Sequence, residues 1–211
     1  MVDISDKNFN LQAILYQAGY FTIKQVTRSK NFKIGITNLE VKEAFANIIL
    51  NNIVSISKES YDLLDFTDAL LDSFYDGDYN QVKNVLNCLI NSLFSFNSIK
   101  CFTESLFVDL VYMYLIYAKA SHVVKEATTL LGRSDLCFDI DDKRFVCEFK
   151  LAHNDKEVLV KLQEAKEQIQ KRKYNMLSTN QEIISLAIVA LNTKDDSNQD
   201  KACEIALIEK L

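Results

Sequence analysis

The stretch "GRSDLCFDIDDKRFVCEFKLA", residues 132–152, decides the fold of this chain. Both 134–140 and 143–152 alternate apolar with polar side chains along much of their length, as half-buried β-strands do. Asp141 and Asp142 stand between them and predict a turn. Two strands joined by so short a turn form an antiparallel hairpin.

Two acids and a lysine gather on this predicted hairpin. Glu148 and Lys150 lie two residues apart on one strand, so their side chains share a face. Asp135 opens the other strand and can face Glu148 across the hairpin. Two carboxylates suit a hard cation such as Mg²⁺, which would activate a water for attack on phosphorus. The lysine would orient or deprotonate that water and stabilise negative charge.

The alternative for the same pattern is a solvated strand face, where Glu and Lys form a weak ion pair. Phe145, Cys147 and Phe149 alternate with the charged residues and predict the buried face of the strand. The two charges then share the other face with Val146, which favours a cleft over open surface.

The elements around the hairpin predict an α/β core. Read from residue 103, the chain gives a helix, three strands, a second helix and a buried strand, with room for one strand more. The predicted ranges are 103–119, 122–131, 134–140, 143–152, 155–175, 182–191 and 202–209. This αβββαβ order covers a predicted domain at 101–211.

Residues 1–100 are predicted to form a mostly α-helical N-terminal region. A helical start ends at Gly19 and is followed by two short strands, Tyr20–Val26 and Phe32–Ile36. From Asn38, a plausible N-cap, apolar residues recur at helical spacing. Further helices are expected near 59–73 and 78–94.

The composition of the 211 residues excludes several classes of protein. Four separate glycines cannot build a P-loop or a dinucleotide-binding loop. Five cysteines without a CxxC motif suggest neither a disulfide framework nor a zinc knuckle, which indicates a reducing, cytoplasmic environment. The N-terminus lacks the pattern of a signal peptide, and no segment is long enough to span a bilayer comfortably. We therefore expect no membrane association.

Five motifs in register resemble the PD-(D/E)xK nuclease module found at the C-terminus of AAA-ATPase-like bacterial proteins. They are contained in "TESLFVDLVYMYL" (103–115), "VVKEATTLLGRSD" (123–135), "FVCEFKLA" (145–152) and "AKEQIQKRKY" (165–174). The resemblance covers residues 103–191 and implies a restriction-endonuclease-like core. Residues 14–50 also resemble the segment that joins ATPase to nuclease in that family, whereas the ATPase itself is missing.

The resemblance implies a role for each matched residue. Asp135 and Glu148 would be metal ligands, and Lys150 would be the catalytic lysine. Glu104 matches a helix glutamate that can complete the metal site, and Gln168 matches the glutamine of an AxxQI motif. The implied cofactor is Mg²⁺ or Mn²⁺.

Glu104 also stands out without any family. It lies on one helical line with Val108, Val111 and Leu115, and an acid on an apolar line needs a partner or a purpose. The alternative is that Glu104 merely begins the helix, where the helix dipole favours an acid.

Basic residues near these motifs are candidates for substrate binding. Arg133 matches the arginine of GRxD and either touches phosphate or pairs with an acid such as Glu126. Lys161 and Arg172 lie on the same flank of the helix as the AxxQI glutamine and could contact a phosphate backbone, although a solvated helix edge is the alternative for each. Tyr174 matches a family tyrosine and is expected to pack.

Two features depart from the expected pattern. Ser134 stands where the superfamily name has proline, which costs no ligand. The formal net charge is −5, and an acidic balance is a difficulty for a DNA enzyme, although a cleft and a metal can bind weakly while partners supply affinity.

The sequence therefore predicts a metal-dependent nuclease that hydrolyses DNA phosphodiester bonds, with nucleic acid as its partner and a separately encoded ATPase as a candidate second partner. One alternative is a non-catalytic DNA- or protein-binding module of the same fold. Another is a nuclease toxin or effector that acts on host nucleic acid. The choice of DNA or RNA, the mode of cleavage and the oligomeric state stay open.

Overall fold

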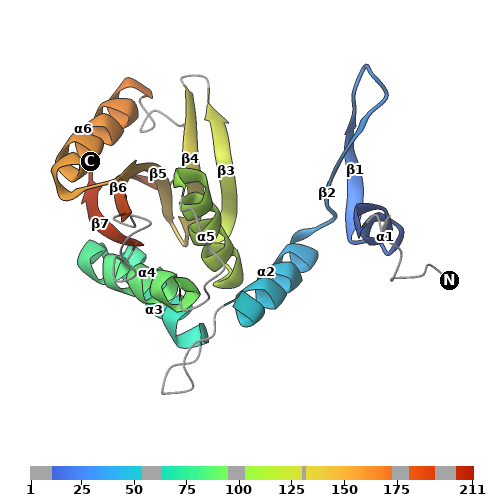
Figure 1. Ribbon diagram of the computed structural model, residues 1–211, viewed down its shortest axis with the longest axis horizontal. Helices are drawn as coiled ribbons and strands as arrows, with labels where there is room; N and C mark the ends of the chain where they lie inside the picture. The colour runs from blue at the N-terminus through green and yellow to red at the C-terminus, as the bar shows by residue number, and fades with distance from the viewer. Residues whose placement is uncertain (1–10, 54–62, 95–102, 130–131, 173–180, 193–202) are drawn as a thin grey trace. The chain divides into compact units, whose positions relative to one another are not determined.

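The computed structural model describes residues 11–53, 63–94, 103–129, 132–172, 181–192 and 203–211 (Figure 1). Contacts within the chain divide it into two units, Met1–Ile48 and Ile49–Leu211. Helices α3 (Leu63–Asp76) and α4 (Tyr79–Phe94) belong to the larger unit. The domain boundary at residue 100 expected from the sequence stays a prediction.

The smaller unit contains a two-stranded antiparallel sheet with a helix before and after it. Its elements are α1 (Leu11–Gln17), β1 (Phe21–Val26), β2 (Phe32–Ile36) and the first part of α2 (Leu39–Ile53). Both predicted strands are confirmed. The Asn38 side chain accepts a hydrogen bond from the Val41 N–H at 3.0 Å, so the predicted N-cap of α2 is confirmed as well.

The larger unit is built on a mixed five-stranded sheet in the order β3-β4-β5-β6-β7. The strands are β3 (Ser121–Thr129), β4 (Gly132–Ile140), β5 (Lys143–Ala152), β6 (Glu182–Asn192) and β7 (Cys203–Lys210). Only β5 and β6 pair in parallel, and α6 (Asp155–Arg172) makes the crossover that parallel neighbours require. With α5 (Glu104–Tyr117) in front of β3, the predicted αβββαβ order is confirmed.

The predicted turn at Asp141 and Asp142 is also confirmed. Ile140 pairs with Lys143, so only these two residues connect β4 to β5. Asp141 has a φ of +50°, a left-handed conformation that aspartate tolerates and that tight hairpin turns use.

Helices cover both faces of this sheet. Figure 1 shows α6 on one face and α3, α4 and α5 on the other. The apolar stripe of α6, which includes Leu162, Ala165 and Ile169, packs against Val146 of β5 and against β6. On the opposite face the ring of Phe145 stacks on Phe138 with centroids 5.0 Å apart.

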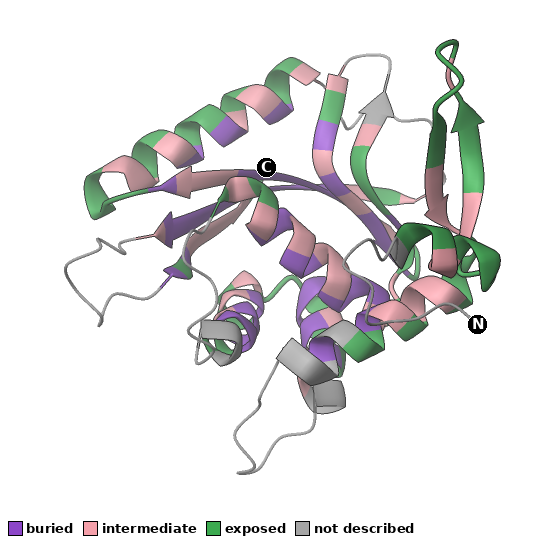
Figure 2. Ribbon diagram, turned by 45° about the vertical axis from the view of Figure 1, so that its right-hand side comes forward, coloured by how far each residue is buried: buried purple, intermediate pink, exposed green. Residues whose placement is uncertain are grey.

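Burial follows from this layering. Figure 2 shows buried residues concentrated on the central strands and on the helix faces that meet them. All residues from Phe145 to Phe149 are buried, because β5 has strands on both sides and helices above and below. The strand that carries the predicted chemistry therefore runs through the interior. In the described residues, no helix combines the length and apolarity needed to cross a membrane.

Candidate active site

Asp135 lies where β4 and β5 stop pairing through their backbones. The register of the two strands runs from Ile140–Lys143 to Leu136–Cys147. Just beyond this last pair, Oδ2 of Asp135 accepts a hydrogen bond from the Phe149 N–H at 2.8 Å. The carboxylate thus takes the place of a backbone acceptor, and its position is fixed relative to β5.

Glu148 is completely buried, with an exposed fraction of 0%. It lies on the face of β5 that meets α6, and two side chains of that helix reach it. The Gln168 amide donates a hydrogen bond to Oε1, and Nη1 of Arg172 lies 3.2 Å from each carboxylate oxygen. A buried charge is stable only with such partners.

Lys150 joins two acids that come from different elements. Its Nζ atom lies 3.8 Å from Oε1 of Glu148 and 3.9 Å from Oε1 of Glu104. It also donates a hydrogen bond to the Phe149 carbonyl at 3.0 Å. With a side chain only 16% exposed, the ammonium group is held between the acids rather than in open solvent.

Glu104 begins α5 and also has a tertiary partner. Thr103 caps the helix, because its hydroxyl accepts a hydrogen bond from the Leu106 N–H at 3.2 Å. Glu104 lies in the first turn, where the helix dipole favours an acid. Its Oε2 accepts a hydrogen bond from the Leu151 N–H at 3.2 Å. Glu104 therefore has a tertiary partner in addition to its favourable place at the helix start, and the contact joins α5 to β5.

A cavity of about 460 Å³ opens beside these residues. Glu104, Asp135 and Arg133 line it, together with Ser105, Val108, Asp109, Lys125 and Glu126. Sequence reasoning missed Lys125 and Asp109, which form an ion pair from β3 and α5. No local pattern marks them, because only the packing of α5 on β3 brings them together.

The remaining basic candidates pair with exposed acids. Arg133 Nη1 lies 3.4 Å from Oε2 of Glu126, the partner that the sequence offered as the alternative to phosphate. Both side chains are at least 60% exposed, so this pair contributes little to stability. Lys161 pairs with Glu164 at 2.7 Å, and this hydrogen bond raises the pKa of Lys161. Tyr174 lies outside the described residues.

Arg172 reaches Glu148 by passing over Gly132. A Cβ atom at Gly132 would lie 2.7 Å from both Cγ and Cδ of Arg172, closer than real Cβ contacts allow. Farther along, Nη1 of Arg172 donates a hydrogen bond to the Arg133 carbonyl. The glycine of GRxD therefore makes room for a helix side chain, a role that sequence reasoning did not find.

The two histidines have other partners. His122 Nδ1 lies 3.0 Å from Oδ2 of Asp139, near the far end of β4. The His153 N–H donates to Oε2 of Glu157 at 2.9 Å, which helps to cap the start of α6. These contacts do not connect either histidine to the acids around Lys150.

The donor set has the chemistry of a site for a hard divalent cation. Asp135, Glu148 and Glu104 offer carboxylate oxygens, and the buried Glu148 already holds the positive charge of Arg172. Within the described ranges, however, no three His, Cys, Asp or Glu side chains are gathered closely enough to hold a metal ion. The three carboxylates are the ligand type that Mg²⁺ and Mn²⁺ prefer. In this structure, however, the Glu148 carboxylate is paired with the Arg172 guanidinium.

Comparison with known proteins identifies one family. The family model described as PD-(D/E)XK nuclease superfamily matches residues 102–200. The matched part runs from α5 through β6 and contains Glu148 and Lys150 together with Glu104, Gln168 and Arg172. No curated protein and no solved structure matches the chain.

Proposed function

Because residues 102–200 match the model of the PD-(D/E)XK nuclease superfamily, we propose that the protein is a metal-dependent nuclease that hydrolyses DNA phosphodiester bonds. The observation that carries the proposal is the meeting of Glu104, Glu148 and Lys150, with Asp135 fixed beside them on the wall of a cavity. The αβββαβ core is restriction-endonuclease-like and supplies these side chains from α5, β4 and β5.

The three acids are the proposed metal ligands. Asp135 and Glu148 would hold Mg²⁺ or Mn²⁺, and Glu104 would complete the site. When bound, such an ion activates a water molecule and neutralises charge that develops on the phosphate. The neighbouring backbone N–H groups of Phe149 and Leu151 orient Asp135 and Glu104 toward β5, which supports these roles.

Lys150 is the proposed catalytic lysine. As an ammonium group, its side chain would orient the attacking water and stabilise negative charge at phosphorus; as the neutral amine, it would instead take a proton from that water. The carbonyl of Phe149 and two carboxylates hold Nζ from three directions, so the group is already positioned before substrate arrives.

Gln168 and Arg172 are proposed to set the orientation and the charge balance of the Glu148 carboxylate. The Gln168 amide fixes the orientation of the carboxylate, and Arg172 supplies its counter-charge while no metal is bound. Metal binding would release Arg172 from Glu148, and the guanidinium could then contact phosphate together with Lys161 and Arg133.

The test is cleavage of supercoiled plasmid and of single-stranded DNA with Mg²⁺, Mn²⁺ or EDTA. The parent chain is expected to cut in a metal-dependent way, and Lys150→Ala and Asp135→Ala are expected to abolish cutting. A single-stranded RNA of matching sequence tests the assignment to DNA.

The matched control is Lys166→Ala, which removes an α6 lysine that pairs with Glu209 instead of a candidate site acid. It should cut like the parent. A parent chain that cuts nothing with either metal, or site variants that cut as well as the parent, would contradict the proposal. The binding-module alternative would then take its place.

A further inference from the structure

The hairpin formed by β1 and β2 concentrates positive charge in an acidic protein. Residues 20–37 contain Lys24, Arg28, Lys30 and Lys33 but no aspartate or glutamate, whereas the whole chain carries a net charge of −5. All four residues are exposed. Within the described residues, none of the four takes part in an ion pair. The hairpin itself therefore presents four positive charges and no negative one.

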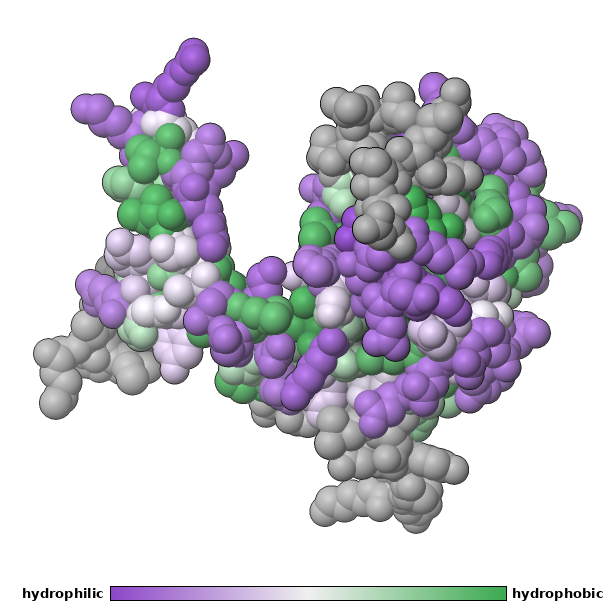
Figure 3. Space-filling model, turned by 180° about the vertical axis from the view of Figure 1, so that it is seen from behind, coloured by the Kyte–Doolittle hydropathy of each residue, from purple (hydrophilic) through white to green (hydrophobic). Residues whose placement is uncertain are grey.

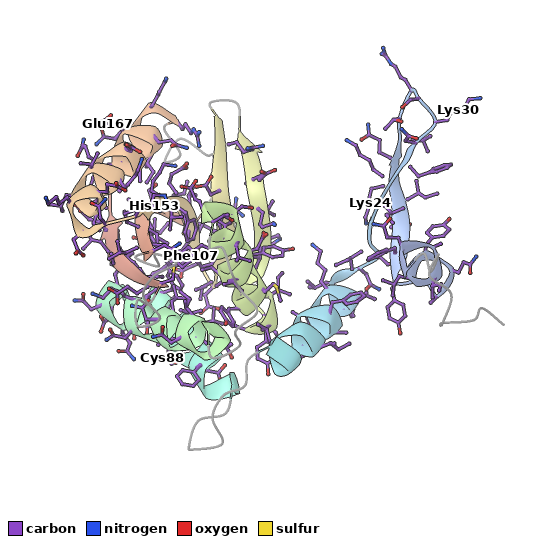
Figure 4. All side chains as sticks on the ribbon, viewed as in Figure 1. Lys24, Lys30, Cys88, Phe107, His153 and Glu167 are labelled. Atoms are coloured by element: carbon purple, nitrogen blue, oxygen red, sulfur yellow. The ribbon has the colours of Figure 1, made fainter. Side chains whose placement is uncertain are left out.

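The tip of the hairpin holds two of these residues in a defined loop. The Thr27 N–H donates to the Asn31 carbonyl at 2.8 Å, and the Lys30 N–H donates to the Thr27 carbonyl at 2.9 Å. The Asn31 N–H also donates to the Thr27 hydroxyl at 3.0 Å. Arg28 and Lys30 thus project from a braced turn, which lowers the entropy lost when a ligand binds. Figure 4 labels Lys30 at this tip and Lys24 along the strands.

The other two basic residues share one face of the hairpin. On β2, Lys33 and Gly35 alternate with Phe32 and Ile34, so they lie on opposite faces. The stem of Lys24 lies over Gly35, where a Cβ atom would come within 3.1 Å of the lysine Cγ. Lys24 therefore belongs to the same face as Lys33.

The opposite face offers an exposed aromatic ring. Phe32 is 62% exposed and pairs across the strands with Val26, which is 56% exposed. Phe32 also lines a hollow of about 490 Å³, together with Gln12, Ala13, Tyr16, Ile23 and Ile34. Figure 3 shows the resulting pattern on this unit, with hydrophilic surface at the far end of the hairpin and hydrophobic surface beside it.

We infer that the β1–β2 hairpin is a nucleic-acid-binding element: its four basic side chains contact the phosphodiester backbone, and Phe32 stacks on an unpaired base. Basic residues that track the backbone and aromatic rings that stack on bases are the combination by which proteins bind single strands. The inference names a contact for the substrate class of the proposed function. It does not depend on cleavage, and it lies outside the region that matches the nuclease family.

The test measures binding of the full chain to fluorescent single-stranded and duplex DNA in EDTA, over a series of salt concentrations. The variant changes Lys24, Arg28, Lys30 and Lys33 to glutamine. We expect at least a tenfold loss of affinity at low salt. Four lost phosphate contacts should also make the plot of log affinity against log salt shallower by about 3.

A matched variant separates local from overall charge. Lys83, Lys119, Lys166 and Lys210 lie in the larger unit, do not line the cavity and change the net charge by the same amount when replaced with glutamine. This variant should keep most of the affinity. An equal loss in both variants, or a hairpin variant that binds like the parent, would overturn the inference. Thermal melting of each variant excludes unfolding as the cause.

Phe32→Ala tests the aromatic part. Loss of one stacked base should weaken single-strand binding about tenfold and leave duplex binding almost unchanged. An unchanged single-strand affinity would remove Phe32 from the inference. A parent chain that binds DNA but cuts nothing with Mg²⁺ or Mn²⁺ would refute the nuclease and leave the hairpin assignment standing. A parent chain that binds no DNA would overturn the inference directly.

Discussion

Two buried acids on neighbouring strands each meet an arginine, but in different ways. Asp139 on β4 is 2% exposed, and Arg144 donates to its two oxygens from two nitrogens, both at 2.7 Å. Glu148 on β5 is 0% exposed, and a single nitrogen of Arg172 lies 3.2 Å from both of its oxygens.

The difference separates a structural pair from one that can open. Asp139 and Arg144 are cross-strand neighbours, and their two parallel bonds form the geometry in which arginine binds carboxylate best. Arg172 comes from the last turn of a helix and divides its Nη1 between Glu148 and the Arg133 carbonyl. Lys150 is a further cation within reach of Glu148. Exchange of partners is therefore easier at Glu148 than at Asp139.

The largest expected difference between Glu148 and Asp139 is in cleavage activity. Glu148→Gln should lower cleavage of plasmid by about 10³-fold or more, because several kcal/mol of metal-assisted stabilisation depend on the carboxylate charge. Asp139→Asn should cleave at nearly the parent rate per folded molecule. Initial rates at saturating Mg²⁺ measure both. Equal losses in the two variants would show that the two acids do not differ in role.

Stability should reverse the ranking of the two acids. Asp139→Asn leaves Arg144 without its charge partner, and breaking such a buried pair costs about 3 kcal/mol. Glu148→Gln should cost less, about 1 kcal/mol, because Arg172 meets Glu148 through a single nitrogen and keeps the Arg133 carbonyl as a second acceptor. Urea unfolding of the two variants measures both values. A larger cost for Glu148→Gln would contradict this comparison.

Low pH should weaken the ion pair between Asp139 and Arg144. Burial alone would raise the pKa of Asp139, but hydrogen bonds from Arg144 and Gln181 and the nearby positive charges outweigh it, so the pKa lies below its usual value of 3.8. A lowered pKa stabilises the fold at pH values above that of the unfolded chain, and this contribution is lost as the pH falls through the folded pKa. The melting temperature of the parent should therefore fall more steeply below about pH 4 than that of Asp139→Asn. Parallel pH profiles for the two chains would refute this.

The smallest expected effect is a change in metal affinity when Arg172, the arginine partner of Glu148, is replaced. Arg172→Gln removes the competing cation, so Mn²⁺ should bind at least about tenfold more tightly, as expected for the loss of one charged hydrogen bond of about 1.5 kcal/mol. Titration followed by electron paramagnetic resonance measures this without DNA. Arg172→Lys, which keeps a positive charge, is the control and should stay closer to the parent. Weaker metal binding in Arg172→Gln would show that Arg172 supports the metal site instead of competing for it.

Much of the β4–β5 hairpin could be predicted, because the sequence patterns that specify it are local. The alternation along β5 placed Glu148 and Lys150 on one face, and the aspartates at 141–142 located the turn. The residues of α6 that pack on the sheet, among them Leu162, Ala165 and Ile169, recur at helical spacing in the sequence. Strand and helix periods carry such information without knowledge of the rest of the fold.

The contacts between elements could not be predicted in the same way. The sequence left Arg172 as either a phosphate contact or a solvated helix edge, whereas in the structure it reaches Glu148 over Gly132. The Lys125–Asp109 pair depends on how α5 crosses β3. Such pairs are set by the packing angle and depth of a helix on a sheet, which no local period encodes.

The central position of β5 has a consequence for the time scale on which the site can change. A strand paired on both sides and covered on both faces opens only with the whole domain, so its amides should be among the slowest to exchange with solvent. Two amides of the strand have side-chain acceptors: the Leu151 amide donates to Glu104, and the Phe149 amide donates to Asp135. The exchange rate of the Phe149 amide therefore reports on the Asp135 carboxylate. A ligand that moves this carboxylate away from the amide should cause deuterium uptake at Phe149, while the rest of the strand stays protected.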